Sequence, residues 1–138
     1  MRKIVLFIVL VGMAAPVFSQ HLIGLTKDEV GKEVKASYPN FYIDNTSVNH
    51  TYKYLKYVDR NNEQTLLVFL SENDICTSTK LMVDYMYLDG MKKDLNKKYK
   101  KAGTNKWTYT KGNTAYQITL KREEWFFSLF TSKKQILQ

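Results

Sequence analysis

The chain contains very little cysteine, proline, glycine or histidine. Among its 138 residues are one Cys, two Pro, six Gly and two His. With Cys76 as the single cysteine, no disulfide can form within the chain and no thiolate cluster can hold a metal. The scarcity of proline and glycine excludes collagen-like, Pro-rich and low-complexity polymers. A content of 44% hydrophobic and 14% aromatic residues instead predicts one globular domain that depends on its hydrophobic core.

Residues 1–19 have the pattern of a secretory signal peptide. Two basic residues precede the apolar stretch 4–15, which is about half as long as a spanning helix and is followed by Pro16. Small residues stand one and three positions before a cut after Ser19, as signal peptidase requires. We therefore predict cleavage there and a mature domain, residues 20–138, that is periplasmic or extracellular and has no transmembrane span. An uncleaved membrane anchor is the alternative.

The charge is strongly positive. The whole chain carries +8, and the predicted mature part has 19 basic and 13 acidic residues, or +6. Export argues against nucleic acid as a partner, so proteins, glycans and anionic surfaces remain. Because planar phosphate and carboxylate recognition usually uses arginine, we interpret the lysine-rich stretch as a solvated face, with an anionic partner as the alternative. Its lysines are Lys92, Lys93, Lys97, Lys98, Lys100, Lys101, Lys106 and Lys111.

The first half of the mature chain, residues 22–83, predicts a helix and three strands. Thr26 and Glu29 form a capping box, so a helix should begin there and end before Pro39. Residues 41–43 are a short extended piece. Alternating or continuous apolar residues then predict strands over 51–58, 66–70 and 75–83. In the first, Tyr52, Tyr54 and Val58 lie on one side and Lys53, Leu55 and Tyr57 on the other. The second is apolar at every position, which predicts a central strand covered on both faces.

The second half, residues 84–132, repeats this order of elements. Apolar residues at spacings of three and four predict a helix over 88–102, capped by Asp84 or Asp89 and ended by Gly103. Strands over 107–109 and 116–120 flank a tight turn at 111–113, and a last strand covers 125–130. Four aromatic side chains are assigned to the core: Phe69, Trp125, Phe127 and Phe130.

These two halves predict an α+β fold. The simplest construction is one curved antiparallel sheet of about six strands, with both helices on one face. Residues 23–30, Ile-Gly-Leu-Thr-Lys-Asp-Glu-Val, resemble the Gly-Met-Thr-Lys-Glu-Glu-Val opening of the first helix in the β-lactamase inhibitor protein-like fold. Small secreted inhibitors and bacterial outer-membrane lipoproteins share that fold. The resemblance covers eight residues and the element order, without the lipoprotein cysteine, and it implies a non-catalytic protein that binds other proteins.

Catalytic and metal-binding patterns are missing from the sequence. His21 and His50 have no companion at metal-ligand spacing, and the chain has no Gly-rich phosphate loop and no Gly-x-Ser-x-Gly elbow. We therefore predict no enzyme activity, no metal and no cofactor. A small hydrolase would require His50 to meet Ser78 or Cys76 in space. We instead expect Cys76 to be an inert core residue.

Aromatic residues on the predicted strands are the best functional candidates. Tyrosine and tryptophan carry binding energy at protein interfaces and stack on sugars. We predict an exported, non-enzymatic binding module that engages a protein or peptide through an aromatic-rich sheet face, although half or more of the candidates should belong to the core. A glycan- or lipid-binding protein is the alternative, and a closed apolar pocket would favour it. The candidate contacts are Tyr52, Tyr54, Tyr57, Trp107, Tyr109 and Tyr116.

Overall fold

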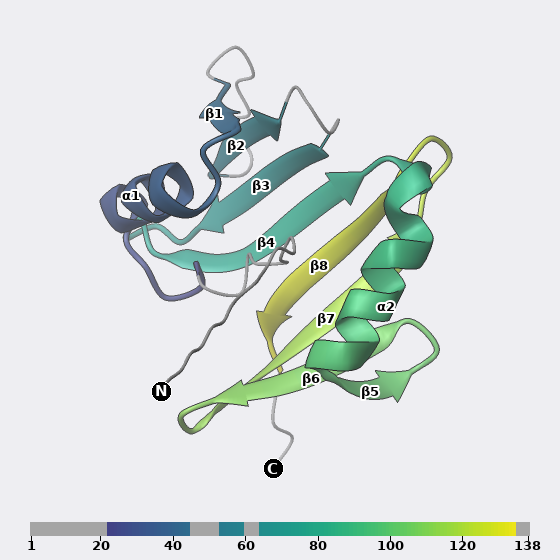
Figure 1. Cartoon of the computed structure of the whole chain (residues 1–138). Helices are drawn as coiled ribbons and strands as arrows, with labels where there is room; N and C mark the ends of the chain where they lie inside the picture. The colour runs from purple at the N-terminus through teal and green to yellow at the C-terminus, as the bar shows by residue number, and fades with distance from the viewer. Residues whose placement is uncertain (1–21, 45–52, 60–63, 135–138) are drawn as a thin grey trace, which may run out of the picture.

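A computed structural model describes residues 22–44, 53–59 and 64–134. Its elements follow the order of two helical segments, each leading into four strands (Figure 1). They are α1 (Lys27–Ser37), β1 (Phe41–Ile43), β2 (Tyr54–Asp59), β3 (Gln64–Leu70), β4 (Cys76–Val83), the 3-10 turn η2 (Tyr85–Tyr87), α2 (Leu88–Lys98), β5 (Lys100–Gly103), β6 (Lys106–Lys111), β7 (Thr114–Arg122) and β8 (Phe127–Lys133).

The eight strands form one open antiparallel sheet in the order β1-β2-β3-β4-β8-β7-β6-β5. The expected antiparallel α+β class is confirmed, but the expected count of about six strands is wrong. The additional strands are β1 and β5, which are short and lie at the two edges of the sheet. Strands β4 and β8, the last of each half, pair at its centre, so the two halves occupy equivalent places about that ladder.

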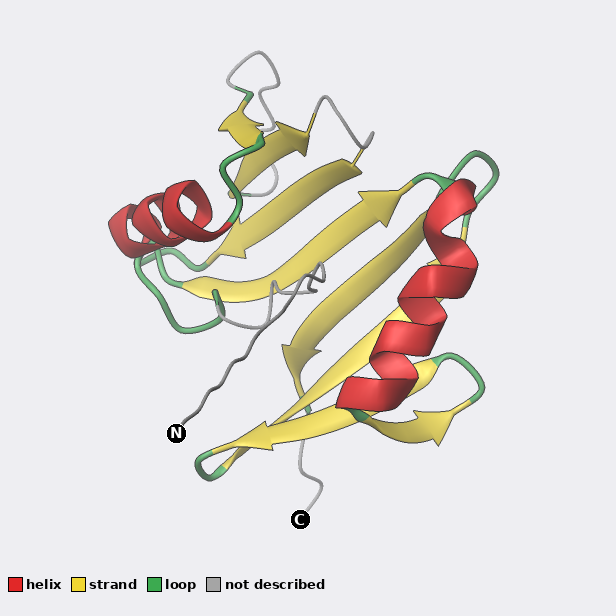
Figure 2. Cartoon of the chain, in the orientation of Figure 1, coloured by secondary structure: helices red, strands yellow, loops and turns green. Residues whose placement is uncertain are grey.

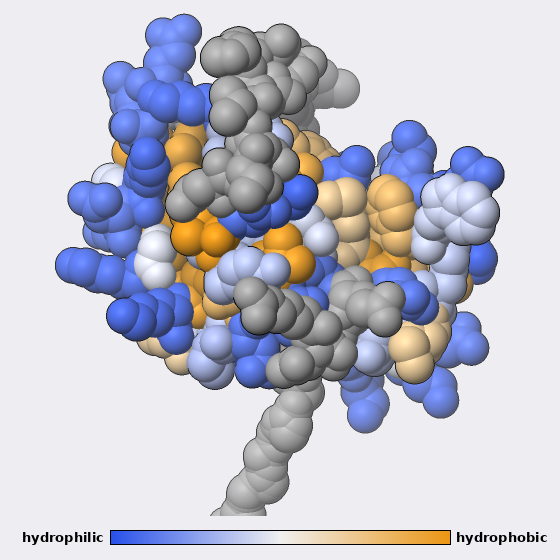
Figure 3. Space-filling view, turned by 90° about the horizontal axis from the view of Figure 1, so that it is seen from above, coloured by the Kyte–Doolittle hydropathy of each residue, from blue (hydrophilic) through white to orange (hydrophobic). Residues whose placement is uncertain are grey.

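Both helices lie on the same side of the sheet, α1 beside the first half and α2 over the second (Figure 2). Their buried residues, which include Val30 and Val34 of α1 and Leu95 of α2, belong to one hydrophobic cluster with the facing sheet residues. Viewed from the upper end of Figure 1, hydrophobic residues gather in the middle of the molecule's surface, with hydrophilic residues on both sides (Figure 3). The sheet therefore has one face that the helices cover and one that they do not.

Helix α1 has the predicted limits because its ends are fixed locally. The Thr26 hydroxyl accepts from the Glu29 backbone N–H at 3.2 Å, and the Glu29 carboxylate accepts from the Thr26 N–H at 2.9 Å. This reciprocal pair satisfies two N–H groups that the first turn leaves without partners. At the other end, the Tyr38 N–H donates to the Val34 carbonyl oxygen, one residue before Pro39.

Helix α2 begins at the predicted residue, Leu88, but ends earlier than predicted. Asp84 caps the 3-10 turn in front of it, accepting from the Met86 N–H at 2.8 Å. The helix ends at Lys98, and the predicted stop, Gly103, lies instead in β5. Tyr99 continues the apolar spacing for a tertiary reason, because its ring packs 5.1 Å from that of Tyr109. The following residues pair with β6 in a hairpin rather than forming another helical turn.

The assignment of four aromatic residues to the core requires correction. Phe127 is fully buried, but Phe69 is half-buried, Phe130 is 40% exposed and Trp125 is 78% exposed. Trp125 lies in the turn between β7 and β8, which a hydrogen bond from the Glu123 N–H to the Phe126 carbonyl closes at 2.8 Å. Trp125 has no partner in the sheet because it lies in this turn. The apolar run 125–130 therefore begins before β8 does.

Candidate binding surface

The strand register divides the sheet residues between the two faces. A cross-strand row of Leu66, Leu81, Leu129 and Leu120 runs through β3, β4, β8 and β7, and all four side chains are buried. Successive residues of a strand point to opposite faces of the sheet. The residues directly before and after each of these leucines in its strand therefore face away from the helices. Within the described residues, no helix covers that second face, which we call the open face.

The open face carries an apolar centre. In the row next to the buried leucines, Leu67 of β3, Lys80 of β4 and Phe130 of β8 are cross-strand neighbours. Tyr54 and Phe69 are paired in the neighbouring row, with ring centroids 6.1 Å apart. The apolar members of the open face, all half-buried or exposed, are Tyr54, Val58, Leu67, Phe69, Met82 and Phe130.

Polar groups border this apolar centre, and one of them, Lys80, lies within it. Lys56 shares the row of Leu67, and its ammonium lies 3.6 Å from the Asp44 carboxylate. Lys80 stands between Leu67 and Phe130 in the register, and Ser78 and Ser132 face each other across β4 and β8. The open face therefore combines an apolar middle with lysine ammonium and hydroxyl groups, a combination typical of protein interfaces.

The six aromatic residues predicted as contacts are divided between different environments. Tyr54 lies on the open face, whereas Tyr52 is outside the described residues. Tyr57, Trp107 and Tyr116 are 6%, 0% and 9% exposed and belong to the side that the helices cover. Half or more of the candidates were expected in the core, and alternation could not identify these three in advance, because it separates the two faces without telling which one the helices bury.

Trp107 and Tyr109 show how these aromatics serve the core instead. The Trp107 indole N–H donates to the Asn96 side-chain oxygen of α2 at 2.8 Å. Tyr109 stacks on Tyr116 with centroids 4.9 Å apart, and burial raises the pKa of its hydroxyl. Among the described residues, that hydroxyl has no hydrogen-bond partner. These side chains attach α2 to the second half of the sheet.

The hydrolase alternative gains nothing from the described residues. Cys76 is 1% exposed, and burial raises the pKa of its thiol to about 12. A buried, protonated thiol is a poor nucleophile. His50, the base that this alternative requires, lies outside the described residues, as does His21. Across the described ranges, no three His, Cys, Asp or Glu side chains are grouped closely enough to hold a metal ion.

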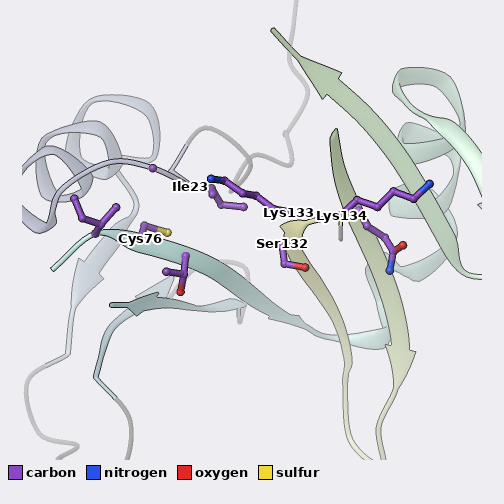
Figure 4. A pocket seen from close by; sticks show the side chains of 9 residues that line it. Ile23, Cys76, Ser132, Lys133 and Lys134 are labelled. Carbon is purple, nitrogen blue, oxygen red and sulfur yellow. The ribbon is translucent and has the colours of Figure 1, made fainter. Parts of the chain in front are cut away.

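A cavity of about 720 Å³ lies where the start of β4 and the end of β8 diverge (Figure 4). Its walls are mixed in polarity and many of them are exposed, so it differs from the closed apolar pocket that would favour a lipid or glycan ligand. Its lining residues are Ile23, Gly24, Ile75, Cys76, Thr77, Gln117, Ser132, Lys133 and Lys134.

Sequence reasoning missed most of the open-face residues. Phe69 and Phe130 were assigned to the core, and Leu67 and Met82 received no functional role. The available indication was the continuous apolar run in β3, because a strand that is apolar at every position has apolar residues on both faces. That run predicted a strand covered on both sides, whereas one of its faces is open.

No protein-family model, curated protein or solved structure matches this chain. The resemblance to the β-lactamase inhibitor protein-like fold therefore stays a prediction. Neither of the described helices is long and apolar enough to cross a membrane.

Proposed function

We propose that this protein is an exported, non-enzymatic binding module that engages a protein or peptide through the open face of its sheet. The observation that carries the proposal is the apolar centre of that face, where Leu67, Phe69 and Phe130 stand in the middle of the sheet without a helix over them. Leu67 and Phe130 lie on either side of Lys80 in the register, and apolar side chains grouped in this way on one uncovered face mark an interaction site more often than a solvated face.

The composition of the open face favours a protein partner. Aromatic and methionine side chains are enriched at the centres of protein interfaces, and Tyr54, Phe69, Met82 and Phe130 provide them here. Lys56 and Lys80 supply donors that can pair with carboxylates or carbonyl oxygens of the partner. Because the backbone beneath these side chains belongs to an eight-stranded sheet, the contact residues are held without the cost of ordering a loop.

A glycan- or lipid-binding protein is the second candidate. The cavity between Ile23 and Lys134 favours it, because Lys133, Lys134 and Gln117 are among the residues that line a space of about 720 Å³. A small anionic ligand is the type that this lining could hold. Its exposed walls make it the weaker candidate, since ligand sites usually bury most of the ligand surface.

The test uses paired substitutions of exposed aromatic residues. Phe130→Asp places a charge in the centre of the open face, whereas Trp125→Asp changes an aromatic residue that is even more exposed and lies in the β7–β8 turn. Each protein is used to capture partners from the native envelope after crosslinking, and its thermal unfolding is recorded first. We expect Phe130→Asp to lose the specific partner and Trp125→Asp to retain it.

Two outcomes would contradict the proposal. Equal capture by the Phe130→Asp and wild-type proteins would remove the open face as the contact surface. A glycan or lipid that stabilises the isolated protein by several degrees, with the effect lost on Lys134→Ala and kept on Phe130→Asp, would support the cavity instead. A ligand at about 100 times its dissociation constant stabilises the native state by about 2.7 kcal/mol, so such a shift is measurable.

A further inference from the structure

The two structurally equivalent halves differ greatly in charge. Residues 22–83 contain 7 basic and 8 acidic residues, a net charge of −1. Residues 84–134 contain 12 basic and 5 acidic residues, a net charge of +7. Since each half contributes one α-helix and four strands to the same sheet, the shared architecture cannot explain the difference. The excess positive charge is therefore a property of the second half that the fold does not require.

Most of this net charge belongs to residues 93–106, with six lysines and one aspartate, and Figure 1 shows the elements that contain them, α2, β5 and β6, at the β5 edge of the sheet. Six exposed lysines follow one another over the outer side of α2, the edge strand β5 and the start of β6, and we call them the lysine rim. Within this stretch Asp94 is the one acidic residue in the sequence. The lysine rim consists of Lys93, Lys97, Lys98, Lys100, Lys101 and Lys106.

This arrangement has a cost for the folded protein. Lys93 and Lys97 are one helical turn apart on the side of α2 opposite its buried residues, and like charges at this spacing destabilise a helix by about 0.2–0.5 kcal/mol. The helix dipole favours Lys97 and Lys98 in the last turn but offers nothing to the lysines of β5 and β6. Among the described residues, no rim lysine takes part in an ion pair; the pairs present join lysines elsewhere to Asp74, Asp44 and Glu123.

We propose that the lysine rim docks the protein onto an anionic lipid surface. Each lysine near such a surface contributes about 1 kcal/mol, and the contributions need no fixed geometry. The rim contains lysine alone, a point charge, without the arginine that forms bidentate bonds to sulfate or carboxylate groups. It also has no exposed aromatic side chain among the described residues on which a sugar could stack, because Trp107 is buried and Tyr99 is half-buried.

The proposed lipid contact leaves the open face available. The rim lies on α2, β5 and the start of β6, whereas the apolar centre of the open face lies on β2, β3, β4 and β8, and β7 stands between the two in the sheet. A protein held at a membrane by its edge can therefore bind a partner through the open face at the same time. The two proposals use different residues, and either can fail without the other.

The test measures binding of the exported form of the chain to lipid vesicles. Sedimentation is compared for vesicles of phosphatidylcholine alone and for vesicles with an equal part of phosphatidylglycerol. We expect binding to the anionic vesicles alone, weakening as salt is raised, because exposed charges are screened over about 10 Å at 0.1 M ionic strength.

Two matched triple variants locate the surface. Lys93→Gln, Lys97→Gln and Lys101→Gln remove three rim charges, and Lys27→Gln, Lys32→Gln and Lys35→Gln remove three exposed charges from α1. Both variants have the same net charge. At about 1 kcal/mol per lysine, we expect the rim variant to bind about 100-fold more weakly and the α1 variant to bind within a few-fold of the wild type.

Three results would overturn the proposal. One is the absence of binding to anionic vesicles, and another is an equal loss in both variants, which would show that net charge alone is responsible. The third is rim-dependent binding to heparin by a protein that ignores vesicles, which would assign the rim to polyanionic glycans. Thermal unfolding of both variants within a few degrees of the wild type ensures that lost binding does not reflect unfolding.

Discussion

The hydrogen bond between Trp107 and Asn96 offers a sharp test of how α2 is held on the sheet. The indole N–H of Trp107 is fully buried and donates to the Asn96 side-chain oxygen at 2.8 Å, the one side-chain hydrogen bond that the structure gives between α2 and β6 in the described chain. Substituting Asn96→Ala removes the acceptor and leaves this donor without a protein partner. A buried donor left unpaired costs about 1–3 kcal/mol.

The surroundings of Asn96 and Trp107 narrow the loss of stability expected for Asn96→Ala. Asn96 is exposed, so water can reach part of the space that its side chain leaves. The loss of stability from the unpaired Trp107 donor should therefore be near the lower limit, about 1 kcal/mol. Alanine is a better helix former than asparagine by roughly 0.5 kcal/mol, which opposes the loss. We therefore expect Asn96→Ala alone to destabilise the domain by about 0.5 kcal/mol.

A double-mutant cycle separates these two contributions. In a Trp107→Phe background the donor is absent, so Asn96→Ala should only gain helix propensity and should stabilise by about 0.5 kcal/mol. The coupling energy between the two sites should therefore be about 1 kcal/mol. Urea denaturation of the four proteins measures it. A coupling energy within about 0.3 kcal/mol of zero would refute the assigned role of this hydrogen bond.

Four further outcomes are expected. Thr26→Ala should destabilise the domain by about 1 kcal/mol in urea denaturation, because it removes the oxygen that caps α1, whereas Thr26→Ser should change little. Thr79→Val should raise stability by about 1 kcal/mol, because the fully buried Thr79 hydroxyl has no partner among the described residues; destabilisation would indicate an unseen partner. Cys76 should resist a thiol reagent at pH 8 until urea unfolds the protein. A thiol pKa of about 12 leaves about 1 thiolate in 10,000 at that pH, and burial blocks access of the reagent. Fast labelling of the native protein would contradict this. The Asp74 carboxylate forms an ion pair with the Lys53 ammonium at 2.6 Å, so its pKa should lie below the usual value by NMR. Its contribution to stability is present above the unfolded pKa and is lost as pH falls through the folded value, and Lys53→Met should move the pKa upward.

Local sequence patterns predicted those parts of the fold that local physics determines. The capping box at Thr26 and Pro39 define α1, and Gly112, whose φ of +63° suits a tight turn, defines the β6–β7 hairpin. Edge strands were harder to predict. The apolar spacing of Tyr99 appeared helical because its packing against Tyr109 comes from another strand and cannot be seen in the local sequence.

The candidate surface could be predicted only in part. Alternation correctly separated Tyr54 and Val58 from Tyr57, but it does not tell which set the helices cover, since that depends on how α1 and α2 pack on the sheet. Phe130 was assigned to the core because its neighbours are all apolar. The lysines of α2 and β5 were recognised from sequence as one basic run, and the structure adds that they surround a sheet edge.

The central ladder between β4 and β8 sets the order in which this chain can fold. Every other pair of neighbouring strands is consecutive in the sequence, so those hairpins need to close only short loops. Pairing Val83 with Phe127 instead closes a loop of more than 40 residues and joins two half-sheets that must already exist. We therefore expect this ladder to form last and to limit the folding rate. The same ladder is where two chains could exchange their second halves at high concentration, since a β8 from another molecule offers β4 an identical partner.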